Sequence, residues 1–579
     1  MFCQLETLRR SDQRDARAVL EMLPKTLDET YERALKDINE NKRENARRLL
    51  HCLAVAARPL RVEELAEILA FDFDRGQGEI PTFEADRRPE NQEEAVLSSC
   101  SSLIAIVNDG DSRVVQFSHL SVKEFLMSDY LSSLTGDLSR FHILPRSAHI
   151  IFAQVCLGFL LHLEDHIDDE SIDKFPLAKY AAQYWVSHAQ VEDVASSVKD
   201  GMTSLFDADK PHFAAWVKTY NIEREPYEEP QLEMASPLYY AALCGFHDLV
   251  KHLAIKHPQY VNAIGGYYEF PLVAALCRKH FQVADVLLEH GGTVGVRGTR
   301  EETPLYRIVR ANEEAIDAVQ FLLERGADVD ARQENLWTPL FLAVDMGDLK
   351  VARVLLEHHA DLNAQTNDSL APLHILSGRY IPISPLEDDD ATFAKLLLEG
   401  GANANLRAKD NSTPLHLACL NKRFEIIRAL LDHGANVDAE NDEGRTPLQE
   451  FFRHDHHSHE DRRVVARLLL VRGAEAYGRD KYHVTASDLA FCFEGEAIWQ
   501  VLHNNSNPFS PEIGRDQSAF RLWLKGELFY SAGVASALLT FLFSTMRDRR
   551  EYTRQVRRDV VTLCVLLWEA RDGAAAARQ

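Results

Sequence analysis

The densest group of potential metal ligands in the sequence is the run RHDHHSHED, which spans Arg453 to Asp461. Imidazole and carboxylate groups are common ligands of divalent metal ions. The run lies in an expected loop between two helices, and it lacks the regular spacing with which a rigid site holds its ion. We therefore interpret it as a solvated loop, and we predict neither a metal nor a cofactor.

Motifs typical of catalysis are missing from the sequence. It contains no GxSxG or HExxH motif, and the Gly-Lys dipeptide that a P-loop needs for nucleotide phosphates occurs nowhere. The nine cysteines are scattered singly without a CxxC pair, which indicates reduced thiols inside a cell. We therefore predict that the chain is not an enzyme.

A recurring Pro-Leu step organises the middle of the chain. Its intervals are 33 to 35 residues, with one of 42 residues. Threonine, which often precedes the proline, can cap a helix, and proline fits the first helical position. The prolines are Pro237, Pro271, Pro304, Pro339, Pro372, Pro414 and Pro447. Each step therefore predicts the start of a helix in a repeating unit.

A second landmark, glycine after a Leu-Leu pair, predicts where each unit's second helix ends, because glycine tolerates the left-handed conformation found there. This landmark falls at Gly291, Gly326, Gly401, Gly434 and Gly473, with His359 in place of one glycine. From each of the first five landmark positions to the next proline the distance is always 13 residues, and from Gly473 it ends on Ala486. Insertions near residues 380–391 and 454–461 fall in the helical half of the unit.

Strings such as TPLHLACLNKRFEIIRALLDHGANVDAENDEGRTPLQ closely resemble the ankyrin repeat. The resemblance covers residues 231–505 and implies about eight repeats, of which the two at the ends are degenerate. It also implies that the constant segment forms a short hairpin finger, and that partner proteins bind along the fingers and the inner helices. We therefore predict an α-solenoid in this half of the chain.

Candidate contact residues are the finger positions that change sequence while the finger keeps its length. Trp337 is the most informative, because a large aromatic side chain at a loop tip offers apolar area that a partner can bury. Met346, at the matching inner-helix position, is expected beside it as part of one contact centre, and packing of Trp337 on the neighbouring finger is the alternative. The other candidates are Arg300, Glu302, Glu334, Asn335, Asp368, Leu370, Lys409, Asp410, Glu443 and Arg445.

Residues 1–230 contain no repeat but show a definite order of predicted elements. Thr26-Leu27-Asp28-Glu29 has the pattern of a capping box that opens a helix, and Ser121-Val122-Lys123-Glu124 has the same pattern. The other predicted elements are two helices, Leu49–Val55 and Val62–Leu69, and the two strands of a hairpin, Leu103–Val107 and Val114–Phe117. Helices followed by a hairpin favour a winged helix.

The strings LPKTLDETYERAL, RPLRVEELAEIL, LSSCSSLIAIV and VVQFSHLSVKEFLMSDYL resemble the fungal NACHT and ankyrin proteins of the signal-transduction ATPase class, which are similar to NOD-like receptors. The resemblance implies that residues 1–40 end a NACHT-type helical module, that residues 41–135 form a winged-helix-like domain, and that residues 136–230 form a helical linker domain. In that family this region couples the nucleotide state to the repeats. The ATPase domain itself is missing, so we expect Met1 to follow it, through a truncated gene model or a lost domain.

Three functions follow from these patterns. The favoured one is a cytoplasmic adaptor or sensor fragment in signal transduction that binds proteins, with the nucleus as an alternative compartment. The second is the regulatory half of a nucleotide-switched ATPase whose P-loop domain lies upstream of Met1. The third is a winged-helix DNA-binding protein, which the net charge of -25 and the acidic helix RVEELAEIL disfavour, because both repel phosphate.

Residues 506–579 are expected to form C-terminal helices. Within them, Leu528 to Met546 contains no charged residue, is long enough to cross a bilayer, and is followed by several arginines. Its serine and threonine residues reduce the hydrophobicity, and a helix that covers the last repeat explains the segment as well. The chain as a whole is therefore predicted to be mostly helical, with a winged-helix-like and helical N-terminal part before the repeats.

Overall fold

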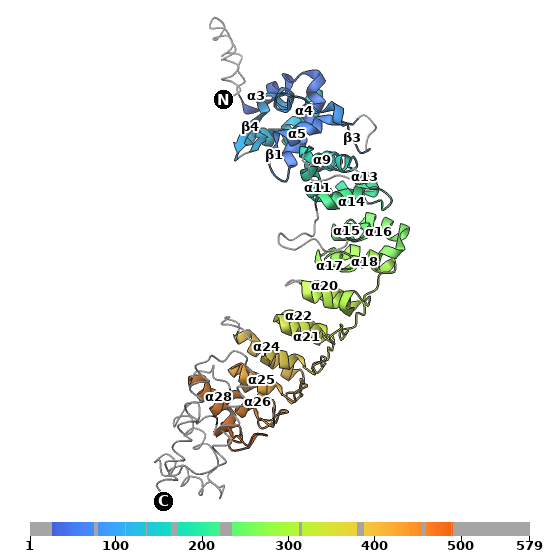
Figure 1. Cartoon of the computed structure of the whole chain (residues 1–579). Helices are drawn as coiled ribbons and strands as arrows, with labels where there is room; N and C mark the ends of the chain where they lie inside the picture. Colours follow the sequence, from blue (N-terminus) through green and yellow to red (C-terminus); the bar gives the residue numbers. More distant parts are fainter. Residues whose placement is uncertain are drawn as a thin grey trace, which may run out of the picture. The chain divides into compact units, whose positions relative to one another are not determined.

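The computed structural model describes residues 26–73, 79–110, 112–134, 136–163, 172, 174–220, 234–311, 315–378, 387–453, 459–487 and 489. The chain divides into two compact units, Met1–Ala327 and Asp328–Gln579, and each is described by itself (Figure 1). The described fold is mostly helical, as the sequence predicts.

The first unit begins with a small domain of helices around a three-stranded antiparallel sheet of order β1-β5-β4. Val115 of the central strand pairs with Leu60 on one side and with Ile106 on the other. The helices are α3 (Leu27–Lys36), α4 (Arg43–Val55), α5 (Val62–Glu67), α6 (Gln92–Cys100), α7 (Leu120–Leu126) and α8 (Asp129–Ser133), with 3-10 turns η1 (Glu40–Lys42), η2 (Ile68–Ala70), η3 (Ala85–Arg87), η4 (Ser101–Leu103) and η5 (Asp137–Phe141). The strands are β1 (Leu60–Arg61), β2 (Phe71–Asp72), β3 (Thr82–Phe83), β4 (Ile104–Asp109) and β5 (Ser112–Phe117).

Local rules predict most of this domain but miss three details. The β4–β5 hairpin is confirmed, and Thr26 caps α3 by accepting from the Glu29 N–H at 3.1 Å. The second predicted capping box is wrong: α7 starts at Leu120, its cap is His119, and the Ser121 hydroxyl bonds the Tyr31 hydroxyl instead. The sequence also missed β1 and the β2–β3 pair, because strands of two residues carry no periodic signal.

A bundle of helices follows in the first unit. It consists of α9 (Pro145–Leu160), α11 (Pro176–Ala189), α12 (Val194–Ser197), α13 (Lys199–Leu205) and α14 (His212–Thr219). Its core is aromatic: Trp185 packs edge-on against Trp216 and stacks on Phe246, which precedes the second helix of the first repeat. Burial of such large rings stabilises the joint between the bundle and that repeat.

Helix α5 is fixed to this bundle by buried carboxylates. Glu67 is 1% exposed, accepts from the Leu177 N–H at the start of α11 at 2.7 Å, and pairs with Arg88 at 2.5 Å. Glu64, also buried, pairs with Arg58 and Arg61 at 2.6 and 3.1 Å. The second helix of the winged helix is therefore part of an internal joint.

Seven helix pairs of the repeat are described, three in the first unit and four in the second. In the first unit they are α15 (Pro237–Leu243) with α16 (His247–Lys256), α17 (Pro271–Cys277) with α18 (Phe281–Glu289), and α19 (Pro304–Ala311) with α20 (Ile316–Glu324), beside the 3-10 turns η6 (Pro258–Tyr260) and η7 (Thr299–Glu301). In the second unit they are α21 (Pro339–Met346) with α22 (Leu349–Glu357), α23 (Pro372–Gly378) with α24 (Glu387–Glu399), α25 (Pro414–Leu420) with α26 (Phe424–Asp432), and α27 (Pro447–Phe452) with α28 (His459–Val471). Within each unit, the first helices of successive pairs pack side by side.

The helix starts obey the capping rule that the sequence suggests. The Thr338 hydroxyl accepts from the Phe341 N–H at 3.2 Å. At Ala371, where alanine replaces threonine, the imidazole of His374 accepts from the Ala371 N–H at 3.1 Å, and His416 accepts from the Thr413 N–H in the same way. Every first helix of a pair in the described residues begins at its landmark proline.

The glycine landmarks adopt left-handed conformations, and His359 is forced into the same one with φ 66°. Since His359 is exposed and loses little packing, replacing it by glycine should stabilise the second unit by about 0.5–1 kcal/mol. Urea unfolding of the two proteins measures this difference. The matched control is His358→Gly, where φ is -94° and glycine should instead destabilise. An unchanged or lower midpoint for His359→Gly would contradict the strain argument.

Several predictions fall outside the described residues, including the C-terminal helices over residues 506–579 with the segment Leu528–Met546, the end of the repeats from residue 490 to 505, and most of the histidine run, residues 454–458. Among the helices that the structure does describe, none is both long and apolar enough to span a bilayer. The same part of the chain contains no group of three or more histidine, cysteine, aspartate or glutamate residues placed to hold a metal ion.

Candidate protein interface

Each finger of the second unit is a tight hairpin closed by backbone hydrogen bonds. The Gln333 N–H donates to the Trp337 carbonyl at 3.1 Å, and the Ala408 N–H donates to the Ser412 carbonyl at 2.9 Å. The turn needs a left-handed residue three positions before the landmark proline, or before Ala486 in the last finger. Those residues are Leu336, Ser369, Asn411, Gly444 and His483, with φ between 57° and 69°. The five fingers therefore share one backbone turn although their side chains differ.

Neighbouring fingertips in the second unit are hydrogen-bonded to one another, and we call this arrangement the fingertip row. The four bonds run from the N–H of Asn367 to Asn335 O at 3.4 Å, of Lys409 to Asp368 O at 3.0 Å, of Asp442 to Asp410 O at 2.9 Å and of Lys481 to Glu443 O at 3.2 Å. The row therefore joins five successive fingers by their backbones.

A second set of bonds ties the same fingers together at their bases. Short side chains accept from a backbone N–H of the next repeat. The pairs are Asp330 with Asp361 at 2.8 Å, Asn363 with Asn403 at 2.8 Å, Asn405 with Asn436 at 2.6 Å and Asp438 with Glu475 at 2.8 Å. Each finger is thus held at two points, so the surface that it presents is preorganised.

The predicted contact centre is partly exposed. The Trp337 ring packs on Phe341 of its own repeat, with ring centroids 4.5 Å apart, and the side chain remains half-buried. Met346 is 45% exposed at the end of α21. At 1.5 Å per residue, Met346 lies roughly 10 Å along α21 from Pro339.

The remaining candidates divide by exposure. Six are exposed: Arg300, Glu334, Asn335, Asp368, Lys409 and Asp410. Leu370 and Glu443 are half-buried. Glu302 and Arg445 are buried, which corrects the expectation that they are exposed finger residues. Both form ion pairs within the protein: Glu302 with Arg307 and Arg310 of the following helix, and Arg445 with partners that include Asp480 of the next finger.

Arg445 lies at the centre of an ion-pair network between two successive fingers. Its guanidinium pairs with Glu443, with Glu450 at 3.4 Å and with Asp480 of the next finger at 3.5 Å. It also lies over the Tyr482 ring, 5.4 Å from the centroid. Since only 4% of the residue is exposed, its charge is used within the protein rather than offered to a partner.

The finger that precedes Pro271 was not among the sequence-based candidates. Ile264 and Tyr267 at this finger are 54% and 42% exposed. Tyr267 stands four residues before the landmark proline, which is also the offset of the candidates Arg300, Asn335 and Asp368 from their prolines. That offset could have identified it, but this first connector has no Leu-Leu-x-x-Gly landmark to reveal the finger.

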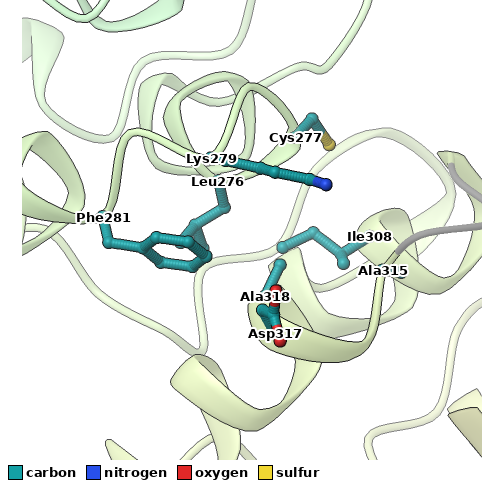
Figure 2. Close-up of a pocket in the computed structure, with 8 residues that line it drawn as sticks. All are labelled: Leu276, Cys277, Lys279, Phe281, Ile308, Ala315, Asp317 and Ala318. Carbon is teal, nitrogen blue, oxygen red and sulfur yellow. The ribbon is translucent and has the colours of Figure 1, made fainter.

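A small hollow lies between the second and third helix pairs of the first unit (Figure 2). Its cavity volume is about 10 Å³, room for about one water molecule and far below the size of an ordinary ligand pocket. Figure 2 shows Lys279 extended above it and Asp317 below. Burial raises the pKa of the Cys277 thiol at its edge to about 12, so this thiol stays protonated and is a poor nucleophile.

Two family descriptions match parts of the chain. "Ankyrin repeats (3 copies)" matches residues 238–333, 272–366 and 386–480. "GPI inositol-deacylase, winged helix domain" matches residues 32–139. These matches coincide with the helix pairs and with the domain around the three-stranded sheet.

Several curated proteins are similar to parts of the chain. Azaphilone pigments biosynthesis cluster protein L of Monascus ruber is 31% identical over 310 residues, which cover 50% of this chain and 64% of that protein. Vegetative incompatibility protein HET-E-1 of Podospora anserina is 27% identical over 232 residues, 36% of this chain and 16% of that protein. Ankyrin repeat and SOCS box protein 11 of Danio rerio is 35% identical over 111 residues, 19% and 37% respectively.

The chain thus spans less than two thirds of the length of each of these relatives. The similarity to HET-E-1 agrees with the resemblance to fungal NACHT-type proteins, and the family matches agree with the predicted repeats and winged helix. The middle of this chain consists of ankyrin repeats, and a winged helix domain similar to that of GPI inositol-deacylase precedes them.

Proposed function

We propose that this chain is a non-catalytic scaffold or sensor fragment that binds partner proteins along the fingers and inner helices of its ankyrin repeats. The observation that supports the proposal is the fingertip row, in which a rigid backbone presents side chains that differ from repeat to repeat. A preorganised surface loses little conformational entropy when a partner binds. Variable side chains on a fixed frame give specificity.

The proposed contact centre in the second unit is the strip between Trp337 and Met346. It combines a half-buried aromatic ring with an exposed thioether, and such side chains are common anchors at interfaces. The candidates around it are Glu334, Asn335, Asp368, Lys409 and Asp410, which are exposed, and Leu370, which is half-buried. We propose the cytoplasm as the compartment of binding, with the nucleus as the alternative.

Replacing Trp337 and Met346 together by alanine tests this centre. A partner that the full chain captures from its source cells would be purified and titrated against both proteins. Loss of two anchors should weaken Kd by about a hundredfold, since each anchor contributes about 1–2 kcal/mol. The control is Val471→Ala, which removes apolar area at a residue 76% exposed outside the strip. Equal affinity of wild type and double variant would refute the centre.

A second candidate function is the regulatory half of a signalling ATPase, and the similarity to HET-E-1 supports it. In this case the N-terminal segments, residues 1–40, 41–135 and 136–230, would couple a nucleotide-binding domain upstream of Met1 to the repeats. Sequencing the 5′ end of the transcript tests the idea. A Walker A motif in frame would favour it, and a stop codon directly upstream would exclude it for this transcript.

The DNA-binding alternative receives less support. Helix α5 packs on α11 with Glu64 and Glu67 buried in the joint, so it would have to leave the bundle to enter a groove. Helix α6, which precedes the hairpin, starts with acidic residues, and Glu93 among them pairs with Arg113 at 2.6 Å. An electrophoretic shift assay at low salt tests this alternative, and a stable complex would revive it.

A further inference from the structure

We infer that the first three repeats carry a second binding face, which takes an acidic segment of a partner protein that also bears an apolar or aromatic side chain. This inference rests on the proposed function, because it assumes that the repeats bind proteins. It concerns a different surface, made by the first finger, by helices α17 and α19 and by the tip of the second finger.

The apolar part of the face is the exposed patch Met234, Ile264 and Tyr267, which we call the finger patch. Their exposed fractions are 51%, 54% and 42%. The finger lies directly against the start of the repeats, because a Cβ on Gly265 would come within 2.9 Å of Ala235 Cα. Met234 and Ile264 are the chain neighbours of these two touching residues, so they expose apolar area at one place.

The arginines of α19 adjoin the finger patch. The Arg307 guanidinium donates to the Tyr267 carbonyl at 3.2 Å and pairs with Glu269 at 3.2 Å and with Glu302 at 3.0 Å. Arg310, one turn later, pairs with Glu302 at 2.8 Å. Glu269 and Glu302 are buried, so these two arginines neutralise two internal carboxylates and fix the geometry of the finger.

Two further arginines leave the face with a positive charge. Arg278, just after α17, and Arg300, at the tip of the second finger, are exposed, and the described part of the chain offers neither of them an ion-pair partner. Arg278 follows Cys277, which lines the same hollow as Ile308, the residue after Arg307. Arg300 follows Thr299, whose hydroxyl bonds Glu269 of the first finger. The finger patch is therefore flanked by uncompensated guanidinium groups.

This local charge is opposite to that of the whole chain, whose net charge is -25. An acidic partner segment is repelled by most of the protein and attracted to this face, which favours binding in one place. Guanidinium groups hold carboxylates with charge-assisted hydrogen bonds, and tyrosine and arginine are the side chains enriched at interface centres. An acidic segment with one apolar anchor satisfies both parts of the face.

The test is selection of short random peptides on the immobilised full chain, followed by titration of the most enriched peptide. We expect peptides rich in glutamate or aspartate around an aromatic or aliphatic residue. The double variant Arg278→Glu with Arg300→Glu should weaken Kd at least about tenfold, which corresponds to about 1.4 kcal/mol, and added salt should weaken it further. Tyr267→Ala should also weaken it, whereas Arg278→Lys with Arg300→Lys should retain most of the affinity.

The matched control is Arg353→Glu, which makes the same charge reversal on an exposed arginine of the outer helix α22. Thermal melts establish that all variants remain folded. Enrichment of peptides without acidic residues would overturn the inference, as would a peptide whose affinity the double reversal leaves unchanged. Loss of binding only in the variant that lacks Trp337 and Met346 would also overturn it, while leaving the proposed function intact.

Discussion

Replacing Arg445 by alanine is expected to lower the free energy of unfolding of the second unit by roughly 3–5 kcal/mol. The guanidinium is buried between two fingers, where it pairs with Glu443, Glu450 and Asp480. Its removal leaves Asp480, which is 7% exposed, without its counter-charge in a site that excludes water. An uncompensated buried carboxylate costs more than the ion pair itself contributes, so the effect is larger than for any exposed finger residue.

Hydrogen exchange of the backbone amides from Asn441 to Ser487, followed with urea, measures this loss of stability where it arises. The control is Lys409→Ala, because the side chain of Lys409 is 77% exposed and its pairing with Asp368 is only at 4.0 Å. We expect a change within about 0.5 kcal/mol for the control. Equal protection factors in the two variants would mean that the Arg445 network contributes nothing beyond an ordinary surface ion pair.

The second large effect concerns the pH dependence of stability through Glu67. Burial raises the pKa of its carboxyl from 4.5 to about 7, against the opposing effects of the Leu177 N–H and of Arg88. Between pH 4.5 and 7 the folded protein keeps a proton that the unfolded chain has lost, so the contribution of Glu67 to stability is complete below pH 4.5. It declines as the pH rises through 7, by about 3 kcal/mol in total.

The variant Glu67→Gln isolates this contribution, because its amide oxygen can still accept from the Leu177 N–H but does not titrate. Urea unfolding of both proteins across this pH range gives two stability curves, and the difference between them removes the other titrating groups. The wild type should lose stability relative to the variant as the pH rises. A flat difference would mean that Arg88 keeps the carboxylate ionised throughout.

The positions at which the repeat helices start and end could be predicted because they depend on local sequence. Proline at the first helical position and a left-handed residue after the second helix are each determined by a few neighbouring residues. His359 adopts the left-handed conformation although it is not glycine, so the position requires this conformation whatever residue occupies it. The winged helix could be predicted for the same reason, because the residues Asn108-Asp109-Gly110-Asp111 are typical of the turn in a hairpin.

The roles of individual finger residues could not be predicted in the same way. The partner of Arg445 on the next finger, Asp480, is 35 residues away in sequence, and Glu302 is neutralised by arginines of the following helix. The Arg445–Asp480 pairing depends on how repeats stack, which a single unit does not encode, whereas the Glu302 pairings lie within one repeat. Trp337 is an intermediate case: its finger position could be predicted, but its packing on Phe341 of its own repeat could not.

The hydrogen bonds at the tip and at the base of each finger explain why the segment from the glycine landmark to the next landmark proline keeps its length. One added residue would displace either the tip bond to the neighbouring backbone or the base bond to the next N–H, and the mismatch would pass to the adjacent fingers. Extra residues can be accommodated only between the helices, where the chain does carry its insertions. Each finger therefore has a fixed backbone length but variable side chains. New binding specificities can arise by substitution without changing the hydrogen bonds between fingers.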